Sequence, residues 1–355
     1  MISISLCMIV KNEEKLLKRC LDSYKPICDE IIIVDTGSTD KTKDIARQYT
    51  NKIYDYQWKN DFADARNFAF SKAGCDYIFS ADADEVLDSE NLQNFLVLKE
   101  HLLPEIDIVQ MIYVNDEKYN TVYNYKEEYR PKLFKRIRTF QWVSPIHETV
   151  RLEPVVFDSD IKILHLPECS HSKRDFSTFI HAVKSGIFLE NYVVIMFCKE
   201  LFISGTDEDF LQAADVFANV LAKEDRNEDC RKNIACVLAR IYRIKGDYNS
   251  FFKICLKDMA NNPCAEICME LGNYFYALND YEEAVLWYIN ASSETPSIID
   301  IHSSGDAPLY QLAKCYEKLS TEARNSGAYD LYNVYYSNML AYREQAENWV
   351  FPEQL

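Results

Sequence analysis

Short apolar runs rich in β-branched residues alternate with amphipathic stretches over the first 142 residues of the chain. The apolar runs predict strands at Ile4–Val10, Glu30–Thr36, Ile53–Trp58 and Tyr77–Ser80. Apolar runs without alternation are typical of parallel strands that are buried on both faces. Helical periodicity follows the first three runs, at Glu13–Tyr24, from a cap at Ser38 or Thr39 to Tyr49, and at Ala63–Ala73. This alternation predicts an α/β fold with a mostly parallel, Rossmann-like sheet.

After about Thr206 the pattern is wholly helical and weakly repetitive. Small and aromatic residues recur at the spacing of a tetratricopeptide repeat, at Leu271, Gly272, Phe275, Ala284, Tyr288, Ala291 and Pro296. A copy lies 33 residues upstream, and a third unit begins near Leu312. An ordinary helical bundle is the alternative. We therefore predict two domains: an α/β domain over residues 1–205 and an all-α, tetratricopeptide-like domain over residues 206–355.

The charge of the chain limits its partners. The 355 residues include 39 basic and 56 acidic side chains, for a formal net charge of −17. Such a charge repels phosphate backbones and anionic membrane surfaces, so the sequence argues against nucleic-acid binding. The helical part is the more acidic, with 13 basic and 24 acidic side chains in residues 201–355. It is suited to docking a neutral or basic polypeptide, although a solvated acidic face is the commoner reason for such a bias.

Glycine and cysteine usage narrows the chemistry further. The eight glycines form no glycine-rich phosphate loop, so a nucleotide would have to be held by carboxylates, a metal or side chains. The twelve cysteines lack zinc-ligand spacing and read as small buried hydrophobes in a reducing compartment. Neither a signal peptide nor an apolar stretch long enough to span a bilayer is apparent. These features predict a soluble, cytoplasmic protein without an integral membrane segment.

Acidic residues follow two of the predicted strands. Asp82 and Asp84 come directly after Tyr77–Ser80, where open α/β sheets place their ligands. Two neighbouring carboxylates repel each other unless a cation lies between them, and a divalent metal supplies that cation. Asp35 ends the strand Glu30–Thr36, where it could accept hydrogen bonds from a ribose or a uracil. The alternatives are a solvated turn for the first pair and a turn-capping role for Asp35.

Four segments carry a resemblance to a known family. They are SLCMIVKNEE (5–14), VDTGSTDKT (34–42), WKNDFADARN (58–67) and ADADE (81–85). In this order and spacing they resemble the GT-A fold glycosyltransferases of family 2. The third segment resembles the subgroup with a C-terminal tetratricopeptide region, which includes bacterial enzymes that glycosylate peptides or proteins. The resemblance implies a UDP-sugar as donor and Mn²⁺ or Mg²⁺ as cofactor.

The resemblance also implies roles for individual residues. Asp82 and Asp84 match a DxD motif whose last carboxylate binds the metal and thereby the diphosphate of the donor. His165 resembles the further metal ligand found after the DxD in many GT-A enzymes. Asp35 would contact the nucleotide base. The rest of the nucleotide pocket is implied to be lined by Val10, Asn12, Glu14, Asp64 and Arg66.

Two further sets of residues are candidates for the reaction itself. An inverting displacement needs a base opposite the leaving diphosphate, and Glu148, with His147 behind it, resembles a His-Glu pair of this subgroup. The chain lacks the acidic dipeptide of the commoner family pattern, and an ordinary hydrogen-bonding role is the alternative for His147 as for His165. Arg130 opens a run of five basic residues in nine and is the favoured clamp for the diphosphate. A solvated strand is the alternative for that run.

Together these features predict a metal-dependent, inverting glycosyltransferase. It would move a hexose or an N-acetylhexosamine from a UDP-sugar to a peptide or protein acceptor held by the helical domain. The sugar, the acceptor atom and the oligomeric state, including a homo-oligomer, stay open. The alternatives are a transferase of cell-surface polysaccharide or lipid-linked glycan, and a catalytically inactive binding protein that acts through its repeats.

Overall fold

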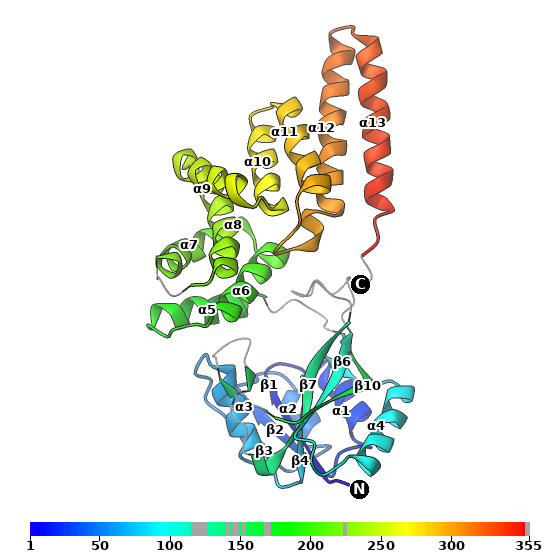
Figure 1. The fold of residues 1–355 in the computed structure, drawn as a ribbon. Helices are drawn as coiled ribbons and strands as arrows, with labels where there is room; N and C mark the ends of the chain where they lie inside the picture. Colours follow the sequence, from blue (N-terminus) through cyan, green and yellow to red (C-terminus); the bar gives the residue numbers. More distant parts are fainter. Residues whose placement is uncertain are drawn as a thin grey trace. The chain divides into compact units, whose positions relative to one another are not determined.

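The computed structural model divides the chain into two compact units, Met1–Leu189 and Glu190–Leu355 (Figure 1). It describes residues 1–114, 127–138, 142–143, 149–150, 154–166, 172–222 and 226–351. The division falls before α6 (Asn191–Ser204) rather than at the expected residues 205 and 206. The reason is that α6 buries an apolar face within the helical unit, where Phe197 stacks on Phe217 of α7 (Asp207–Leu221).

The first unit contains an eight-stranded mixed sheet with the strand order β3-β2-β1-β4-β7-β6-β10-β5. The strands are β1 (Ile4–Val10), β2 (Glu30–Asp35), β3 (Ile53–Asp55), β4 (Tyr77–Ser80), β5 (Glu85–Val86), β6 (Ile108–Val114), β7 (Glu127–Lys135) and β10 (Val156–His165). A separate ribbon pairs β8 (Trp142–Val143) with β9 (Thr149–Val150). Four of the pairings in the large sheet are parallel and three are antiparallel. The expected α/β class, with a Rossmann-like parallel half, is confirmed.

The direction of the strands brings several carboxyl ends to one edge of the sheet. β1, β2 and β4 are parallel, and β7 runs antiparallel between β4 and β6. β6 and β10 therefore run in the same direction as β4. As a result Val10, Asp35, Ser80 and His165 end their strands at the same edge, where open α/β sheets bind ligands.

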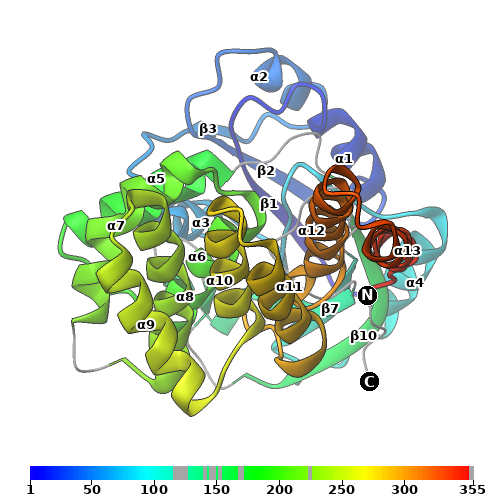
Figure 2. The same cartoon turned by 90° about the horizontal axis from the view of Figure 1, so that it is seen from above.

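Helices cover both faces of this sheet. Successive residues of a strand point to opposite faces, so the apolar strands need a helical layer on each side. Leu6 and Met8 of β1 belong to the core beneath α1 (Leu17–Tyr24) and α4 (Ser89–His101), whereas Cys7 packs on the side of α3 (Phe62–Phe70) (Figures 1 and 2). The remaining helices of this unit are α2 (Thr42–Ala46), the 3₁₀ turn η2 (Arg136–Arg138) and α5 (Ser172–Lys184).

One local expectation was wrong, and the structure disagrees with one of the alternatives. Neither Ser38 nor Thr39 caps α2, which begins at Thr42, because the Ser38 hydroxyl accepts the backbone N–H of Asn12 instead. The basic run is not a solvated strand either. Its residues up to Lys135 belong to β7, which lies between β4 and β6, so Leu133 is fully buried and little of Lys132 reaches solvent.

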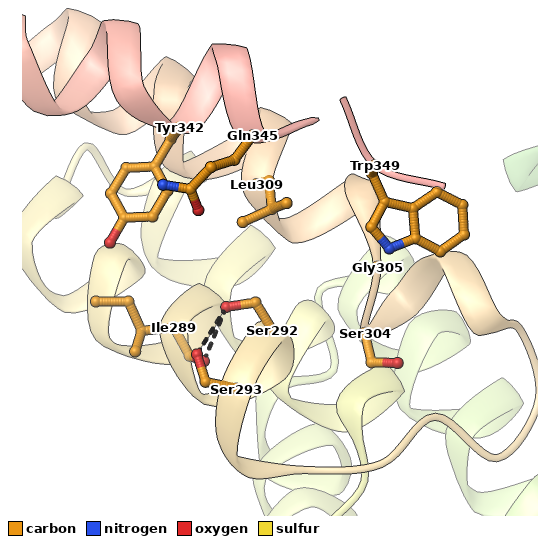
Figure 3. A pocket seen from close by; sticks show the side chains of 9 residues that line it. All are labelled: Ile289, Ser292, Ser293, Ser304, Gly305, Leu309, Tyr342, Gln345 and Trp349. Atoms are coloured by element: carbon orange, nitrogen blue, oxygen red, sulfur yellow. Dashed lines mark hydrogen bonds between the residues drawn. The ribbon is translucent and has the colours of Figure 1, made fainter. Parts of the chain in front are cut away.

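The second unit is an array of paired helices, which stand side by side in chain order (Figure 2). After α6 and α7 they are α8 (Glu228–Lys245), α9 (Tyr248–Asn261), α10 (Ala265–Ala277), α11 (Tyr281–Ile289), α12 (Asp306–Asn325) and α13 (Tyr329–Glu347). A π-helical turn, η3 (Asn290–Glu294), and a 3₁₀ turn, η4 (Ile301–Ser303), join α11 to α12. A pocket lies between this connection and α13 (Figure 3).

The seam between α10 and α11 shows why the repeat needs its small residue. A Cβ atom on Gly272 would fall 2.5 Å from a ring carbon of Tyr288, which is fully buried and donates its hydroxyl to Asn273. The backbone of α10 therefore approaches the aromatic ring as closely as the packing allows. The pairing of successive helices and this small-to-aromatic seam confirm the expected repeat-like organisation.

Candidate functional site

The carboxylate of Asp84 lies beside the imidazole of His165 at the carboxyl edge of the sheet. Asp84 Oδ2 and His165 Nε2 are 3.2 Å apart, and both side chains are largely shielded from solvent. The backbone explains this contact, since β5 pairs antiparallel with β10 and sets Glu85 opposite His165. The carbonyl oxygen of Asp84 also accepts the N–H of Leu166 at 2.9 Å. Residues 81 positions apart in the chain are thus brought together, and their shared role as metal ligands, which the resemblance implies, stays a prediction.

One ring nitrogen of His165 has no hydrogen-bond partner among the described residues. Its Nδ1 is buried and forms no hydrogen bond within the part of the chain that the structure describes. Its ring lies 5.2 Å from the ring of Tyr113. A buried polar atom without a partner is uncommon in a folded protein and calls for an additional group. The imidazole and the Asp84 carboxylate together offer one nitrogen and one oxygen ligand to a divalent cation.

Asp82, the other acid of the motif, is held by Arg66 of α3. The guanidinium donates to both carboxylate oxygens at 3.1 and 3.3 Å and to the hydroxyl of Ser80 at 3.1 Å. It also lies over the ring of Trp142, 5.2 Å from the ring centre. Partial burial opposes ionisation of Asp82, but Arg66, assisted by Lys132, lowers the pKa of Asp82 to about 2. The Asp82 carboxylate is therefore ionised at neutral pH, and its nearest cation is Arg66 of α3.

A third acid, Glu85, anchors the motif from beneath. Its side chain is completely buried and pairs with Lys132 of β7, of which only 6% is exposed. Its second oxygen accepts the backbone N–H of Asp82 at 3.3 Å. Burial raises the pKa of Glu85, while the Lys132 ammonium acts in the opposite direction. The pair ties the loop of Asp82 and Asp84 to the centre of the sheet, a role that no sequence motif indicated.

Arg130, the expected diphosphate clamp, stacks on an aromatic ring. Its guanidinium carbon lies 3.7 Å from the ring centre of Tyr113, and its Nε donates to Glu128. The same ring also contacts the imidazole of His165, so Tyr113 touches both Arg130 and one of the metal-ligand candidates. The structure thus places Arg130 near the site, and contact with a diphosphate stays a prediction.

The end of β1 and the turn after β2 interlock. The side-chain oxygen of Asn12 accepts the N–H of Thr39 at 2.8 Å, and Glu14 accepts the N–H of Lys41 at 3.1 Å. Asn12 adopts a positive φ of 57°, which asparagine tolerates better than most residues. Val10 pairs with Asp35 across the strands. These contacts join the two segments into one hydrogen-bonded turn structure at the carboxyl edge.

Asp35 caps its own turn, which was the alternative to a contact with a base. Only 1% of it is exposed, and it accepts the backbone N–H groups of Gly37 and Ser38 at 3.1 and 3.0 Å. The ammonium of Lys43 lies 3.4 Å from the carboxylate. A contact with the nucleotide base stays a prediction.

Asp64 lies on α3 two residues before Arg66, so the two side chains leave the helix on different sides. It accepts hydrogen bonds from Tyr56 at 2.5 Å and from Lys59 at 2.7 Å. The Lys59 ammonium and the Tyr56 hydroxyl hold the pKa of Asp64 below its usual range. Asp64 thus binds Tyr56 and Lys59, which precede it in the chain, and it makes no contact with the motif of Asp82 and Asp84 among the described residues. His147 and Glu148, the predicted base pair, lie outside the described residues.

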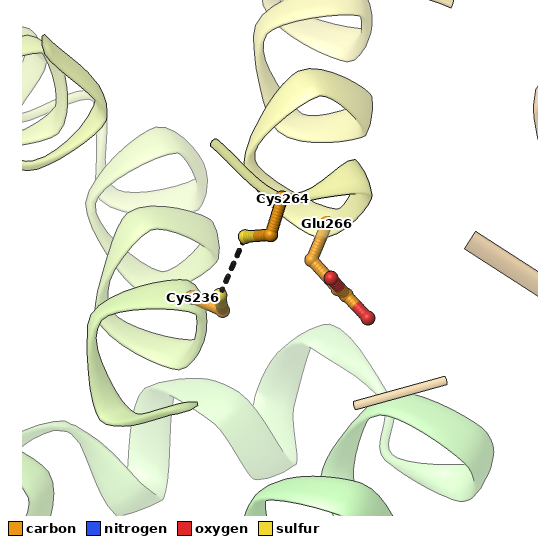
Figure 4. Close-up of side chains that lie close together, drawn as sticks. All are labelled: Cys236, Cys264 and Glu266. Atoms are coloured by element: carbon orange, nitrogen blue, oxygen red, sulfur yellow. Dashed lines mark hydrogen bonds between the residues drawn. The ribbon is translucent and has the colours of Figure 1, made fainter. Parts of the chain in front are cut away.

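A second group of ligand-type side chains lies in the helical unit. Among the described residues, Cys236, Cys264 and Glu266 are the only trio of His, Cys, Asp or Glu whose ligand atoms lie within 4.8 Å of one another (Figure 4). The two sulfur atoms are 3.5 Å apart. The Glu266 carboxylate points away from them and accepts the backbone N–H groups of three consecutive residues, 298–300. It therefore joins α10 to the segment before η4, and the thiols fill the core as the sequence predicts.

Comparison with known proteins bears on the first unit. Residues 5–151 match the family model described as Glycosyl transferase family 2. The first unit contains a family 2 glycosyltransferase domain. The match begins in β1, includes all four sequence segments and ends beyond the two candidate base residues. None of the helices in the described residues is both long and apolar enough to cross a membrane.

Similar proteins in other organisms match over part of the chain. A TPR repeat-containing protein of Synechococcus elongatus is 48% identical over 87 residues, which are 24% of this chain and 22% of that protein. The SPbeta prophage-derived glycosyltransferase SunS of Bacillus subtilis is 41% identical over 91 residues, 25% of this chain and 22% of that protein. The aligned part of the chain thus spans less than a quarter of the length of either relative.

Among solved structures the likeness is distant. Glucosyl-3-phosphoglycerate synthase of Mycobacterium tuberculosis, in complex with Mn²⁺, UDP-glucose and phosphoglyceric acid, gives a TM-score of 0.40 at 16% identity over 54% of this chain and 82% of that one. TarS of S. aureus gives a TM-score of 0.38 at 14% identity over 71% of this chain and 54% of that one.

Proposed function

We propose that this glycosyltransferase moves a hexose or an N-acetylhexosamine from a UDP-sugar to a peptide or protein, with inversion and with the help of a divalent metal. The observation that carries the proposal is the convergence of Asp84 and His165 at the carboxyl edge of the sheet, beside the Arg66-bound Asp82. A solvated surface turn would not need a largely shielded imidazole against its second carboxylate. The sequence match to the family supplies the reaction class.

The residues present fit a metal. Neighbouring ligands of an octahedral ion with bonds of about 2.1 Å stand about 3 Å apart, close to the 3.2 Å between Asp84 Oδ2 and His165 Nε2. An imidazole in the ligand set favours Mn²⁺ over Mg²⁺, which prefers oxygen. Because Nε2 is the nitrogen beside the Asp84 carboxylate, it is the proposed ligand atom of His165. When bound, the metal would neutralise charge on the departing diphosphate.

The chain's own residues prepare the site for that diphosphate. Arg66 directs one Asp82 charge toward α3, which lowers the repulsion between the two acids of the motif. Glu85 and Lys132 fix the loop, so that Asp84 does not have to be ordered when the donor binds. We propose that Asn12, Glu14, Asp35 and Asp64 border the nucleotide. Glu148, with His147, is the proposed base.

The acceptor is proposed from the helical unit. Repeat arrays of this type present extended surfaces suited to polypeptide segments, and this one carries most of the negative charge of the chain. A neutral or basic peptide is therefore the favoured acceptor. A cell-surface polysaccharide or a lipid-linked glycan is the alternative acceptor. The alternative to a transferase is a catalytically inactive protein that binds partners through its repeats.

Donor turnover tests the proposal. The full chain with Mn²⁺ should release UDP from UDP-glucose or UDP-N-acetylglucosamine, and Asp84→Asn should lower the rate by at least about 100-fold, as expected for loss of a charge-stabilising group. Asp44→Asn, on an exposed helical position, is the matched control and should leave the rate unchanged. Intact-mass analysis of proteins co-expressed with the chain would then identify sugar and acceptor. No turnover of any UDP-sugar would favour the binding-protein alternative.

A further inference from the structure

A pocket of about 410 Å³ lies wholly within the helical unit, away from the motif of Asp82 and Asp84 in the chain (Figure 3). Its volume falls in the range of about 300–1,000 Å³ that small-molecule sites occupy. One wall is the π-helical turn η3 with the end of α11, and the other is the last part of α13. Leu309 of α12 forms an apolar floor between them.

The polar groups of this pocket are all uncharged. Tyr342 and Gln345 project from α13 toward Ser292 and Ser293 on the opposite wall (Figure 3). The two serine hydroxyls are 3.2 Å apart, and Ser292 also donates to a backbone carbonyl. A hydroxyl has one donor and two acceptor sites, so the serine pair can still bind a ligand as donor and as acceptor. The Gln345 amide forms no hydrogen bond to any other residue that the structure describes. None of the nine lining residues is charged, although charged residues make up 27% of the chain.

An indole completes the rim of the pocket. Trp349 lies so close to Gly305 that a Cβ atom there would fall 2.5 Å from the ring. His302 packs at 5.1 Å between ring centres and fixes the indole from another side. The indole is only partly buried, so it offers an aromatic surface and an N–H group to a ligand. Such an aromatic surface beside neutral hydroxyl and amide groups suits the apolar C–H faces and the hydroxyls of a sugar ring.

The wall of the pocket is also irregular in a way that ordinary repeat packing does not require. Residues Asn290–Glu294 extend α11 by a π-helical turn, and such turns occur frequently at functional sites. The turn places Ser292 and Ser293, rather than one of them, on the pocket side. The irregular backbone and the neutral polar lining are independent observations that favour a bound ligand.

We propose that this pocket binds a neutral saccharide, one or two sugar residues in size, in a site separate from the donor site. The absence of a charged lining side chain disfavours phosphates, nucleotides and carboxylates as its ligands. Trp349 would contact a sugar face, while Gln345, Ser293 and Tyr342 would hydrogen bond to hydroxyl groups. The inference goes beyond the proposed transfer reaction and does not depend on it, because the site is complete without metal or UDP-sugar.

Tryptophan emission and saturation-transfer NMR on the full chain test the inference. The probes are methyl glucoside, methyl N-acetylglucosaminide and maltose, added without metal or nucleotide. We expect saturable binding in the millimolar range, with a change in emission that is lost in Trp349→Phe. Gln345→Ala should weaken binding about fivefold, the effect of about one hydrogen bond to a neutral partner. Gln212→Ala, on an exposed position of α7, is the matched control and should bind like the parent chain.

Each outcome supports or overturns the proposal that the pocket binds a saccharide. Weaker binding by Trp349→Phe and Gln345→Ala in the NMR measurement, with unchanged thermal unfolding and normal binding by the control, supports it. Sugar binding that all three variants retain would place the sugar elsewhere and overturn the inference. No saturable binding of any of the three probes up to about 100 mM, a range that excludes even very weak sites, would overturn it as well. None of these results depends on donor turnover, so failure here is distinct from failure of the proposed reaction.

Discussion

The buried pair of Glu85 and Lys132 should respond strongly to the loss of one partner. Lys132→Met keeps the length of the side chain and removes its charge, which leaves the fully buried Glu85 carboxylate without its cation. The two acids of the motif also raise the pKa of Glu85. Without Lys132, both burial and repulsion by Asp82 and Asp84 therefore disfavour the charged form of Glu85. Removing one partner of a buried ion pair costs about 3–5 kcal/mol. We expect a loss of that size in the unfolding free energy of the first unit.

Two further variants separate the charge effect from a packing effect. The double variant Lys132→Met with Glu85→Gln has no buried charge, and its amide oxygen still accepts the N–H of Asp82. We expect it to recover most of the loss and to lie within about 1.5 kcal/mol of the parent chain, as nearly isosteric core changes do. Lys162→Met is the matched control, because Lys162 pairs with Glu127 where both side chains are about two-fifths exposed. It should cost less than about 1 kcal/mol.

Urea unfolding measures these differences if it reports on one unit. Trp58 and Trp142 belong to the first unit, whereas Trp287 and Trp349 belong to the second. A background with phenylalanine at positions 287 and 349 therefore confines tryptophan emission to the first unit. The reasoning is refuted if Lys132→Met costs no more than Lys162→Met. It is equally refuted if the double variant is no more stable than Lys132→Met.

Other predictions concern packing and charge elsewhere. Gly272→Ala should destabilise the helical unit by about 1–3 kcal/mol in thermal unfolding, because the added methyl group overlaps the ring of Tyr288; unchanged stability would mean that the helices separate freely. Asp107 accepts two hydrogen bonds from Arg138, at 2.8 and 2.7 Å, and this pairing lowers the pKa of Asp107. Its stabilising effect is present above the unfolded-state pKa of about 3.9 and is lost as the pH falls through the lower folded-state value. Asp107→Asn should therefore melt earlier than the parent chain at pH 7, with the difference shrinking toward pH 3, and a difference that is constant with pH would contradict this.

The sequence predicts the parts of the site that depend on strand ends. Continuous apolar runs give β1 and β4 with their observed bounds, and the acids that follow a parallel strand must lie at its carboxyl edge. The proximity of His165 to Asp84 follows only from the resemblance, because the pairing of β5 with β10 is a long-range contact. The repeat spacing likewise predicts Gly272 and Tyr288 as seam residues, since the period of the repeat fixes both positions.

Other features could not be predicted because they depend on tertiary packing. A run with five basic residues resembles a solvated strand, yet it supplies an inner strand of the sheet, and Lys132 is buried because Glu85 neutralises it. Nothing local to Arg66 indicates that it binds Asp82, 16 residues away. The α6 helix lies beyond the expected boundary because its apolar face has its partner on α7.

The central claim is that Asp84 and His165 hold a metal that binds the diphosphate of the donor. Calorimetric titration of the full chain with UDP, in the presence of Mn²⁺ or of EDTA, tests it most directly. We predict that Mn²⁺ tightens UDP binding at least about tenfold, equivalent to about 1.4 kcal/mol, and that Asp84→Asn abolishes this gain while Asp44→Asn preserves it. Equal affinity for UDP with and without Mn²⁺, or a gain that survives Asp84→Asn, would contradict the account.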